Sequence, residues 1–345
     1  MAVKIISHGD ADGICAAALA KARFPEAEIW FSRPITLFND LQNVEPGTTV
    51  VILDIAISET QKQQVFQRMR ELAREDEVIY VDHHPLPPGT LRNDVPATHF
   101  SHALGASASE LTFRLFQGSI NPDLDRVALW GAIADYCEDT DFVRNGLSKY
   151  DLRTIYLEAG LLSQALGEAA GDYHYKRDIV VKLAQCVPPS DIADLVERAI
   201  RATKREWETW RYVKEHAVKD GNLAVVYDLP SGSLGKAALY ALGVADADIG
   251  ICTRTSENEV DISVRRRVGV NIDINELLRH ITARIGGSGG GHKSAAGATI
   301  PAELLETFLK TIKQEISPVI GGGVVSISRS EEAKKILKDN QPEQE

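Results

Sequence analysis

The chain has 345 residues, of which 44% are hydrophobic and 25% are charged, and its formal net charge is −11 at pH 7. This length suffices for two or three domains, and this apolar content suffices for packed cores, which excludes an intrinsically disordered chain. The negative charge argues against a protein that coats long duplex nucleic acid with a broad basic face. Short or single-stranded nucleic acids stay open as partners, because bound metal ions would neutralise part of the acidic excess.

The start of the chain reaches polar residues soon after two isoleucines, so it lacks the apolar core of a signal peptide. No later segment has the roughly 20 apolar residues that a membrane-spanning helix needs. The cysteines are widely spaced and form no zinc-type pattern, which favours reduced thiols: Cys15, Cys137, Cys186 and Cys252. We therefore predict a cytoplasmic protein with no membrane partner.

The first half of the chain alternates short apolar runs with helical patterns. Strands are predicted at residues 3–7, 49–55 and 78–81, and helices at 13–24 and 59–74. Such alternation is typical of a parallel sheet with helices on both faces. In open sheets of this kind, ligands bind beyond the carboxyl ends of the strands.

A helical region follows the proline-rich segment at residues 85–89. Its patterns predict helices at 106–117 and 123–134, a further helical stretch from about 149 to 186, and a long charged helix at 191–218. We interpret the last helix as a connector between domains.

A second α/β pattern begins after this connector. It predicts strands at 223–229, 249–254, 260–266 and 298–300, helices at 234–242, 274–285 and 302–316, and a glycine loop before the last strand. We therefore predict an α/β protein with an N-terminal parallel-sheet domain and a smaller C-terminal α/β domain across a cleft. The expected boundaries are 1–187 for the first domain, 188–220 for the connector, 221–320 for the second domain and 321–345 for a tail.

Polar residues follow three of the predicted strands: His8, Asp10 and Asp12, then Asp54, then Asp82, His83 and His84. A helix cap would explain one aspartate alone, but not all of these residues at equivalent positions. Clustered carboxylates repel one another, and divalent cations relieve that repulsion. Mixed oxygen and nitrogen ligands suit manganese, with magnesium, cobalt or zinc as competitors. Because one ion needs fewer ligands, we predict two ions bridged by a carboxylate.

A glycine cluster with one histidine lies at residues 286–297. Such a cluster could be a flexible linker, but His292 and the neighbouring small residues favour a closely packed turn whose backbone amides bind an anion. Arg265 begins a run of three arginines, and a guanidinium can bind a phosphate through two hydrogen bonds. Strand alternation places Arg265 and Arg267 on one face and Arg266 on the other.

These motifs resemble those of the DHH phosphoesterases. Four successive motifs match His8-x-Asp10-x-Asp12, Asp54, Asp82-His83-His84 and Asp135. The run from Gly289 to Gly297 resembles the signature of the associated C-terminal substrate domain, and the whole resemblance spans residues 3 to 300. The residues before Gly289 depart from the commonest bacterial form and look more like those of archaeal relatives.

The resemblance implies a role for each matching residue. One metal ion would be held by His8, Asp10 and Asp54, and the second by Asp12, Asp54, His83 and Asp135. Asp82 would be a ligand or lie next to the ligands, and His84 would face the substrate phosphate. The family pattern favours Asp135 over its acidic neighbours Glu138, Asp139 and Asp141. The substrate would be bound by Arg265, Gly289, Gly290, Gly291 and His292.

The resemblance also implies an enzyme similar to nanoRNases and RecJ-type exonucleases. We expect a manganese-dependent phosphodiesterase that hydrolyses short oligonucleotides or single-stranded RNA or DNA ends to mononucleotides. The alternatives are a cyclic dinucleotide phosphodiesterase, an exopolyphosphatase or pyrophosphatase, and a non-catalytic scaffold associated with replication. The scaffold is the weakest alternative, because every expected metal position is filled. A homodimer, the preference for RNA or DNA and the direction of degradation stay open.

Overall fold

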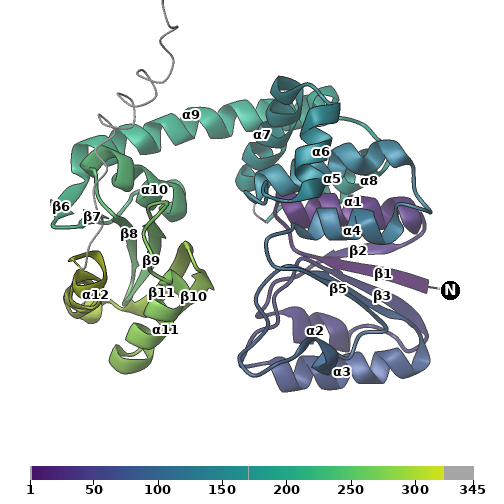
Figure 1. Ribbon diagram of the computed structural model, residues 1–345, viewed down its shortest axis with the longest axis horizontal. Coiled ribbons are helices and arrows are strands. Elements are labelled where there is room, and N and C mark those ends of the chain that lie inside the picture. Colours follow the sequence, from purple (N-terminus) through teal and green to yellow (C-terminus); the bar gives the residue numbers. More distant parts are fainter. Residues whose placement is uncertain (1, 170, 322–345) are drawn as a thin grey trace, which may run out of the picture. The chain divides into compact units, whose positions relative to one another are not determined.

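The computed structural model of the protein describes residues 2–169 and 171–321 (Figure 1). The tail predicted at 321–345 lies outside the described residues except for Gly321. The chain divides into two compact units between Lys204 and Arg205, within the long helix α9 (Ala193–His216). A helix therefore occupies the position of the predicted connector.

The first unit contains a sheet of five parallel strands in the order β2-β1-β3-β4-β5. The strands are β1 (Ala2–Ser7), β2 (Glu28–Phe31), β3 (Thr48–Leu53), β4 (Val78–Asp82) and β5 (His99–His102). Along β3, Val51 and Leu53 pack into one apolar cluster, whereas Val50 and Ile52 pack into another on the opposite face. Burial on both faces explains the continuous apolar runs of the sequence and confirms the parallel sheet.

Helices cover both faces of this sheet (Figure 1). One face carries α1 (Ala11–Arg23), α4 (Ala108–Phe116), α5 (Asp125–Ala134), α7 (Leu152–Glu168) and α8 (Tyr173–Ala184), with α6 (Asp141–Lys149) beside α5. The other face carries α2 (Leu37–Gln42) and α3 (Lys62–Glu75). The strand order changes direction at β1, and the ligand crevice of such sheets lies at this switch point between β1 and β3.

Several elements of the first unit were not predicted. The strands β2 and β5 lie at the two edges of the sheet and have four residues each, and the mostly polar sequence of β5 hides any apolar run. The helical stretch expected from 149 to 186 is interrupted, because Asp172 begins a new helix. Its side chain accepts a hydrogen bond from the backbone N–H of Tyr175 at the start of α8.

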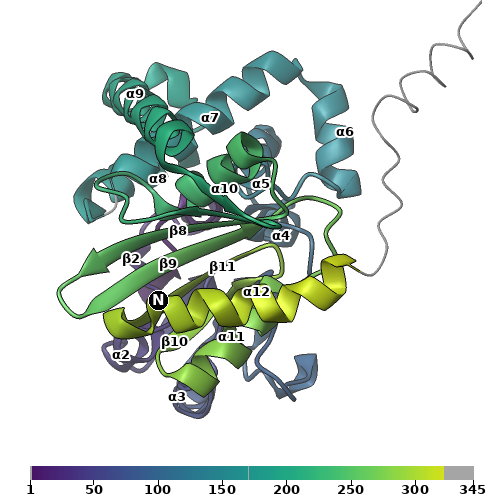
Figure 2. The ribbon, with the colours of Figure 1, turned by 90° about the vertical axis from the view of Figure 1, so that its left-hand side faces the viewer.

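The second unit contains a sheet in the order β10-β11-β9-β8-β7-β6. Its strands are β6 (Val218–Asp220), β7 (Leu223–Val226), β8 (Ile249–Ser256), β9 (Glu259–Arg266), β10 (Ser288–His292) and β11 (Ala295–Pro301). The helix α10 (Leu234–Ala245) packs on one face, and α11 (Ile274–Ile285) and α12 (Leu305–Gly321) pack on the other (Figure 2). This mixed sheet confirms a second α/β domain.

The prediction of a glycine loop was wrong, because these residues form the edge strand β10. It pairs with β11 in antiparallel fashion, and the turn between them consists of Lys293 and Ser294. The glycines allow β10 to lie directly on α11: a Cβ atom at Gly289 would come within 3.1 Å of Cγ2 of Thr282. Composition alone cannot distinguish such close packing of a strand from a flexible loop.

Candidate metal centre

The first metal motif lies in a tight turn between β1 and α1. Asp10 caps α1, and its carboxylate accepts a hydrogen bond from the backbone N–H of Gly13 (3.0 Å). A Cβ atom at Gly13 would lie only 2.4 Å from the carbonyl oxygen of His8, so a residue larger than glycine would push the turn apart. The turn therefore fixes His8 and Asp10 relative to the end of the strand.

A first group of ligand atoms surrounds His8. Its Nδ1 atom lies 2.8 Å from Oδ2 of Asp10 and 3.7 Å from Oδ2 of Asp54. Asp54 follows β3, is 2% exposed, and has a φ of 59°, in the left-handed region. Such a backbone conformation costs an aspartate roughly 1–2 kcal/mol, and it persists where the surrounding structure demands it.

A second group surrounds His83, which directly follows β4. Its Nε2 atom lies 3.3 Å from Oδ1 of Asp54, 3.4 Å from Oδ2 of Asp135 and 4.0 Å from Oδ2 of Asp12. The two oxygens of Asp54 thus face two different histidines, Oδ2 towards His8 and Oδ1 towards His83. This is the arrangement that a carboxylate bridging two ions requires.

Asp12 has strong backbone partners in addition to its neighbours in the cluster. Its two oxygens accept hydrogen bonds from the backbone N–H groups of Ala108 (2.7 Å) and Ser109 (3.0 Å), at the start of α4. The positive end of a helix dipole stabilises a carboxylate at this position. Gly131 on α5 provides the space, because a Cβ atom there would lie 2.8 Å from Oδ1 of Asp12. Each oxygen keeps a second lone pair with which to bind a cation.

Asp82 is 1% exposed and is directed at His84 rather than at the other carboxylates. Its Oδ1 atom lies 2.8 Å from Nδ1 of His84, and its Oδ2 atom accepts a hydrogen bond from the hydroxyl of Tyr80 (3.1 Å). The carbonyl oxygen of Ile55, 2.8 Å away, shares this one hydroxyl hydrogen with Asp82. A buried carboxylate held in this way orients the imidazole of His84.

Burial and crowding shift the pKa values of these groups. Burial, followed by the charge of Asp10, raises the pKa of Asp54 well above its usual range, and burial together with the charge of Asp12 raises that of Asp135 to about 6. Burial disfavours the charged ring of His83, but its contact with Cys137 and the charge of Asp12 outweigh burial and raise its pKa to about 9. Without a cation, the cluster therefore retains protons to limit its repulsion.

These residues fit divalent cations. Among the described residues, three groups place their ligand atoms within 4.8 Å of one another: His8 with Asp10 and Asp54, Asp54 with His83 and His84, and His83 with Asp135 and Cys137. Asp54 belongs to two of these groups, and so does His83. Buried carboxylates beside imidazoles suit manganese, magnesium or zinc better than a monovalent ion.

Cys137 was not among the predicted ligands, but its side chain lies within this cluster. Its Sγ atom lies 3.6 Å from Oδ2 of Asp135 and 3.9 Å from Nδ1 of His83. The only sequence signal for it is its position two residues after Asp135.

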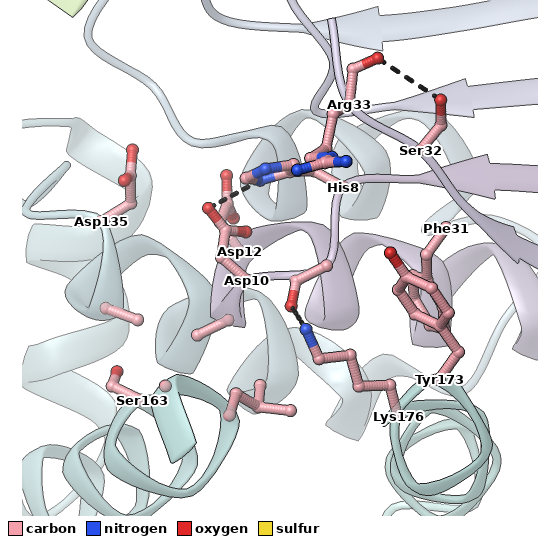
Figure 3. Close-up of a pocket in the computed structure, with 15 residues that line it drawn as sticks. His8, Asp10, Asp12, Phe31, Ser32, Arg33, Asp135, Ser163, Tyr173 and Lys176 are labelled. Atoms are coloured by element: carbon pink, nitrogen blue, oxygen red, sulfur yellow. Dashed lines mark hydrogen bonds and ion pairs between the residues drawn. The ribbon is translucent and has the colours of Figure 1, made fainter. Parts of the chain in front are cut away.

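A pocket of about 470 Å³ adjoins His8, Asp10, Asp12 and Asp135 within the first unit (Figure 3). Its other walls include residues that the sequence patterns did not single out, and these come from the end of β2, from the loop after it, from α7 and from the start of α8: Phe31, Arg33, Ser163, Tyr173 and Lys176. Phe31, Arg33, Tyr173 and Lys176 escaped prediction because the edge strand β2 and the start of α8 were themselves not predicted.

The expected substrate residues lie in the second unit. Gly289, Gly290, Gly291 and His292 belong to β10, where the backbone N–H of Gly291 donates to Oδ1 of Asn275 (3.0 Å). His292 is exposed at the end of this strand.

The three arginines of the run have different partners. Arg265 lies beside the start of α10, because a Cβ atom at Gly235 would come within 2.4 Å of its Nη2 atom. Arg266 donates to the carbonyl of Val270 (2.6 Å), and Arg267 pairs with Asp246 (2.7 Å). Arg267 lies outside β9, so strand alternation does not extend to it.

Two protein-family models match the chain. The DHH family N-terminal domain matches residues 2–136, which contain every residue of the metal cluster except Cys137, and the DHHA1 domain matches residues 220–317. The chain belongs to the DHH family. A DHH domain followed by a C-terminal DHHA1 domain confirms the resemblance drawn from the sequence motifs.

Similar proteins extend this assignment at the level of the fold. An uncharacterised protein of Methanocaldococcus jannaschii is 32% identical over 75 residues, which is 21% of this chain and only 23% of that protein. RecJ from Thermus thermophilus, solved in complex with Mn²⁺, has 18% identity and a TM-score of 0.66 over 92% of this chain and 52% of RecJ. The pGpG-specific phosphodiesterase PggH from Vibrio cholerae has 14% identity and a TM-score of 0.59 over 92% of this chain and 99% of PggH.

None of the helices in the described ranges combines the length and the apolar character that crossing a bilayer requires.

Proposed function

We propose that this DHH protein is a metal-dependent phosphodiesterase that hydrolyses short oligonucleotides, or single-stranded RNA or DNA ends, to mononucleotides. The observation that carries the proposal is the position of Asp54, whose two oxygens face the two histidines of separate ligand groups. One carboxylate shared in this way is typical of two-metal phosphoesterase sites.

The first ion would be held by His8, Asp10 and Asp54, and the second by Asp12, Asp54, His83 and Asp135. Divalent ions at such a site supply Lewis acidity, which polarises a phosphate ester and makes water a better nucleophile. Manganese is our first choice of metal, with magnesium, cobalt or zinc as alternatives. The solved complex of RecJ with Mn²⁺ supports manganese as a ligand of this fold.

His84 and Arg33 would bind the phosphate that reacts. The Asp82–His84 pair fixes the imidazole, which can then donate a hydrogen bond to a phosphoryl oxygen as negative charge develops there. The exposed side chain of Arg33 lines the same pocket as His8 (Figure 3). A guanidinium at this position would attract a phosphodiester towards the acidic cluster.

The second unit would bind the nucleotide through Arg265, Gly289, Gly290, Gly291 and His292. This role in substrate binding predicts that His292→Ala raises the KM for an oligonucleotide. The number of bound metal ions should change little. A short substrate is favoured over a long one by the net charge of −11. The pGpG specificity of PggH, a similar fold, also supports a dinucleotide-sized substrate.

The proposed function is tested by incubating the protein and Mn²⁺ with end-labelled RNA and DNA of graded length, cyclic dinucleotides and polyphosphate. We expect mononucleotides to be released fastest from short oligonucleotides of about two to five residues. A short substrate is expected because the pocket holds only about one nucleotide. Cleavage of polyphosphate alone, or of cyclic dinucleotides alone, would contradict the proposal. Asp54→Asn serves as the inactive control.

A further inference from the structure

The pocket beside the metal cluster has an aromatic wall that the DHH motifs do not include. Phe31 is the last residue of β2, and Tyr173 is the first residue of α8. Their ring centroids lie 5.8 Å apart with planes 20° from parallel, so the two rings stack. Figure 3 shows them together on the side of the pocket away from Asp135.

The two rings differ in exposure. Phe31 packs against the apolar core of the first unit, whereas Tyr173 is 43% exposed and lines the pocket. A flat ligand cannot enter between rings that already stack on each other. It can, however, stack on the open part of the Tyr173 ring and extend the pair.

Lys176 ties this aromatic wall to the metal motif. It follows Tyr173 by three residues on α8, so both side chains lie on the same face of the helix. Its Nζ atom donates a hydrogen bond to the carbonyl of Gly9 (2.6 Å), the residue between His8 and Asp10. Lys176 is 4% exposed, which keeps this link out of water. The aromatic wall and the metal residues are therefore held at a fixed separation by one buried contact.

We propose that this pocket is a base-binding subsite, in which the base of the nucleotide next to the reacting phosphate stacks on Tyr173. The inference rests on the proposed function, because it takes the ligand of the metal cluster to be a nucleotide. A volume of about 470 Å³ lies in the range of small-molecule sites and accommodates one nucleoside. Every base has an aromatic face, so the subsite should accept purines and pyrimidines alike.

The proposal is tested by calorimetric titration of the full chain, loaded with Mg²⁺, with adenosine 5′-monophosphate and with ribose 5-phosphate, which lacks the base. We expect the nucleotide to bind about tenfold more tightly or better, because stacking of one base contributes about this factor. Tyr173→Ala and Tyr173→Leu should remove the difference, and Tyr173→Phe should retain it. Equal binding of the two ligands by the wild type, or a difference that survives in Tyr173→Leu, would overturn the proposal.

Tyr156→Ala is the matched control. Tyr156 lies on α7 of the same unit, is 41% exposed, and does not line the pocket. Its replacement should leave the preference for the nucleotide unchanged. Loss of the preference in this variant as well would show that the effect of Tyr173 is not local, and would overturn the proposal.

Kinetics distinguish failure of this proposal from failure of the proposed function. The wild type should hydrolyse dinucleotides with one abasic position more slowly than normal dinucleotides. Tyr173→Ala should hydrolyse the two kinds of dinucleotide at equal rates. If the wild type hydrolyses normal and abasic dinucleotides equally, the subsite is wrong and the function stands. If no oligonucleotide is hydrolysed while the nucleotide still binds better than ribose 5-phosphate through Tyr173, the function is wrong and the subsite stands.

Discussion

At the scale of single residues, the site depends on how a few carboxylates share their oxygens. Asp54 faces both His8 and His83, Asp12 binds the start of α4, and Asp82 is directed at His84 and Tyr80. The sequence motifs predicted which residues belong together. They left open whether Asp82 is a ligand, because residue order does not specify the direction of a side chain.

The role of Asp82 is open to a direct test. Asp82→Asn keeps the shape of the side chain but replaces the carboxylate that pairs with His84. We expect kcat to fall by about 10- to 100-fold with unchanged manganese stoichiometry, as for other partners that orient functional histidines. Steady-state kinetics and calorimetry measure the two effects. A marked loss of bound manganese would show that Asp82 is instead a ligand.

The shifted pKa values predict how manganese affinity depends on pH. Asp135 has a pKa of about 6 and His83 of about 9, both above their ordinary values, so these groups hold protons that a cation must displace. Raising the pH removes this competition. The affinity should therefore rise at least about tenfold per pH unit between pH 6 and pH 8, where His83 must lose one proton. Calorimetry in buffers of different ionisation enthalpy should show proton release, and an affinity independent of pH would contradict the account.

At the scale of elements, glycines set the distances between helices and the cluster. Gly131 brings α5 close to Asp12 and Ser109, and a Cβ atom there would lie 2.3 Å from Oγ of Ser109. Gly13 closes the turn after β1 in the same way. Hydrophobic periodicity predicted the helices that carry these glycines, but not the close approach that requires them.

Gly131→Ala should destabilise the first unit and weaken the metal site. The added methyl group overpacks the contact with Ser109 and Asp12, for which we expect a loss of about 1–3 kcal/mol in the free energy of unfolding. Chemical denaturation measures this change, and calorimetry should show weaker manganese binding.

Gly160→Ala is the matched control for Gly131→Ala. Gly160 is an exposed residue of α7, and a Cβ atom there would have no neighbour within 4 Å. The substitution should stabilise the protein by up to about 1 kcal/mol, because alanine favours a helix over glycine. Equal effects of the two substitutions would contradict the packing argument.

The parts of the fold that the sequence did not predict share a physical cause. Edge strands such as β2 and β5 are short, and they are buried less than the central strands, so their patterns are weak. The glycine run has no side chains whose alternation could indicate a strand, and its structure depends on α11 lying beneath it. The central strands and the metal motifs at their ends were predicted because burial on both faces imposes a strong apolar pattern.

At the scale of the whole molecule, chemistry is divided between the two units. Every residue of the metal cluster and the base-binding pocket precedes Lys204, and the residues proposed to bind the rest of the substrate follow it. A fragment of residues 1–216, which keeps α9 whole, should therefore bind manganese with the affinity of the full chain. It should hydrolyse dinucleotides with a raised KM, because Arg265 and His292 are missing. A folded fragment that binds no manganese would contradict this division.

The central claim is that Asp54 joins two metal sites, and electron paramagnetic resonance of the protein titrated with Mn²⁺ tests it most directly. The wild type should bind two ions per chain and give the spectrum of an exchange-coupled pair, since a shared carboxylate and a short separation couple their spins. Asp54→Asn should lose the coupled spectrum, and Asp139→Asn, an exposed neighbour of the cluster, should retain it. A spectrum of isolated ions in the wild type, or a coupled spectrum in Asp54→Asn, would contradict the claim.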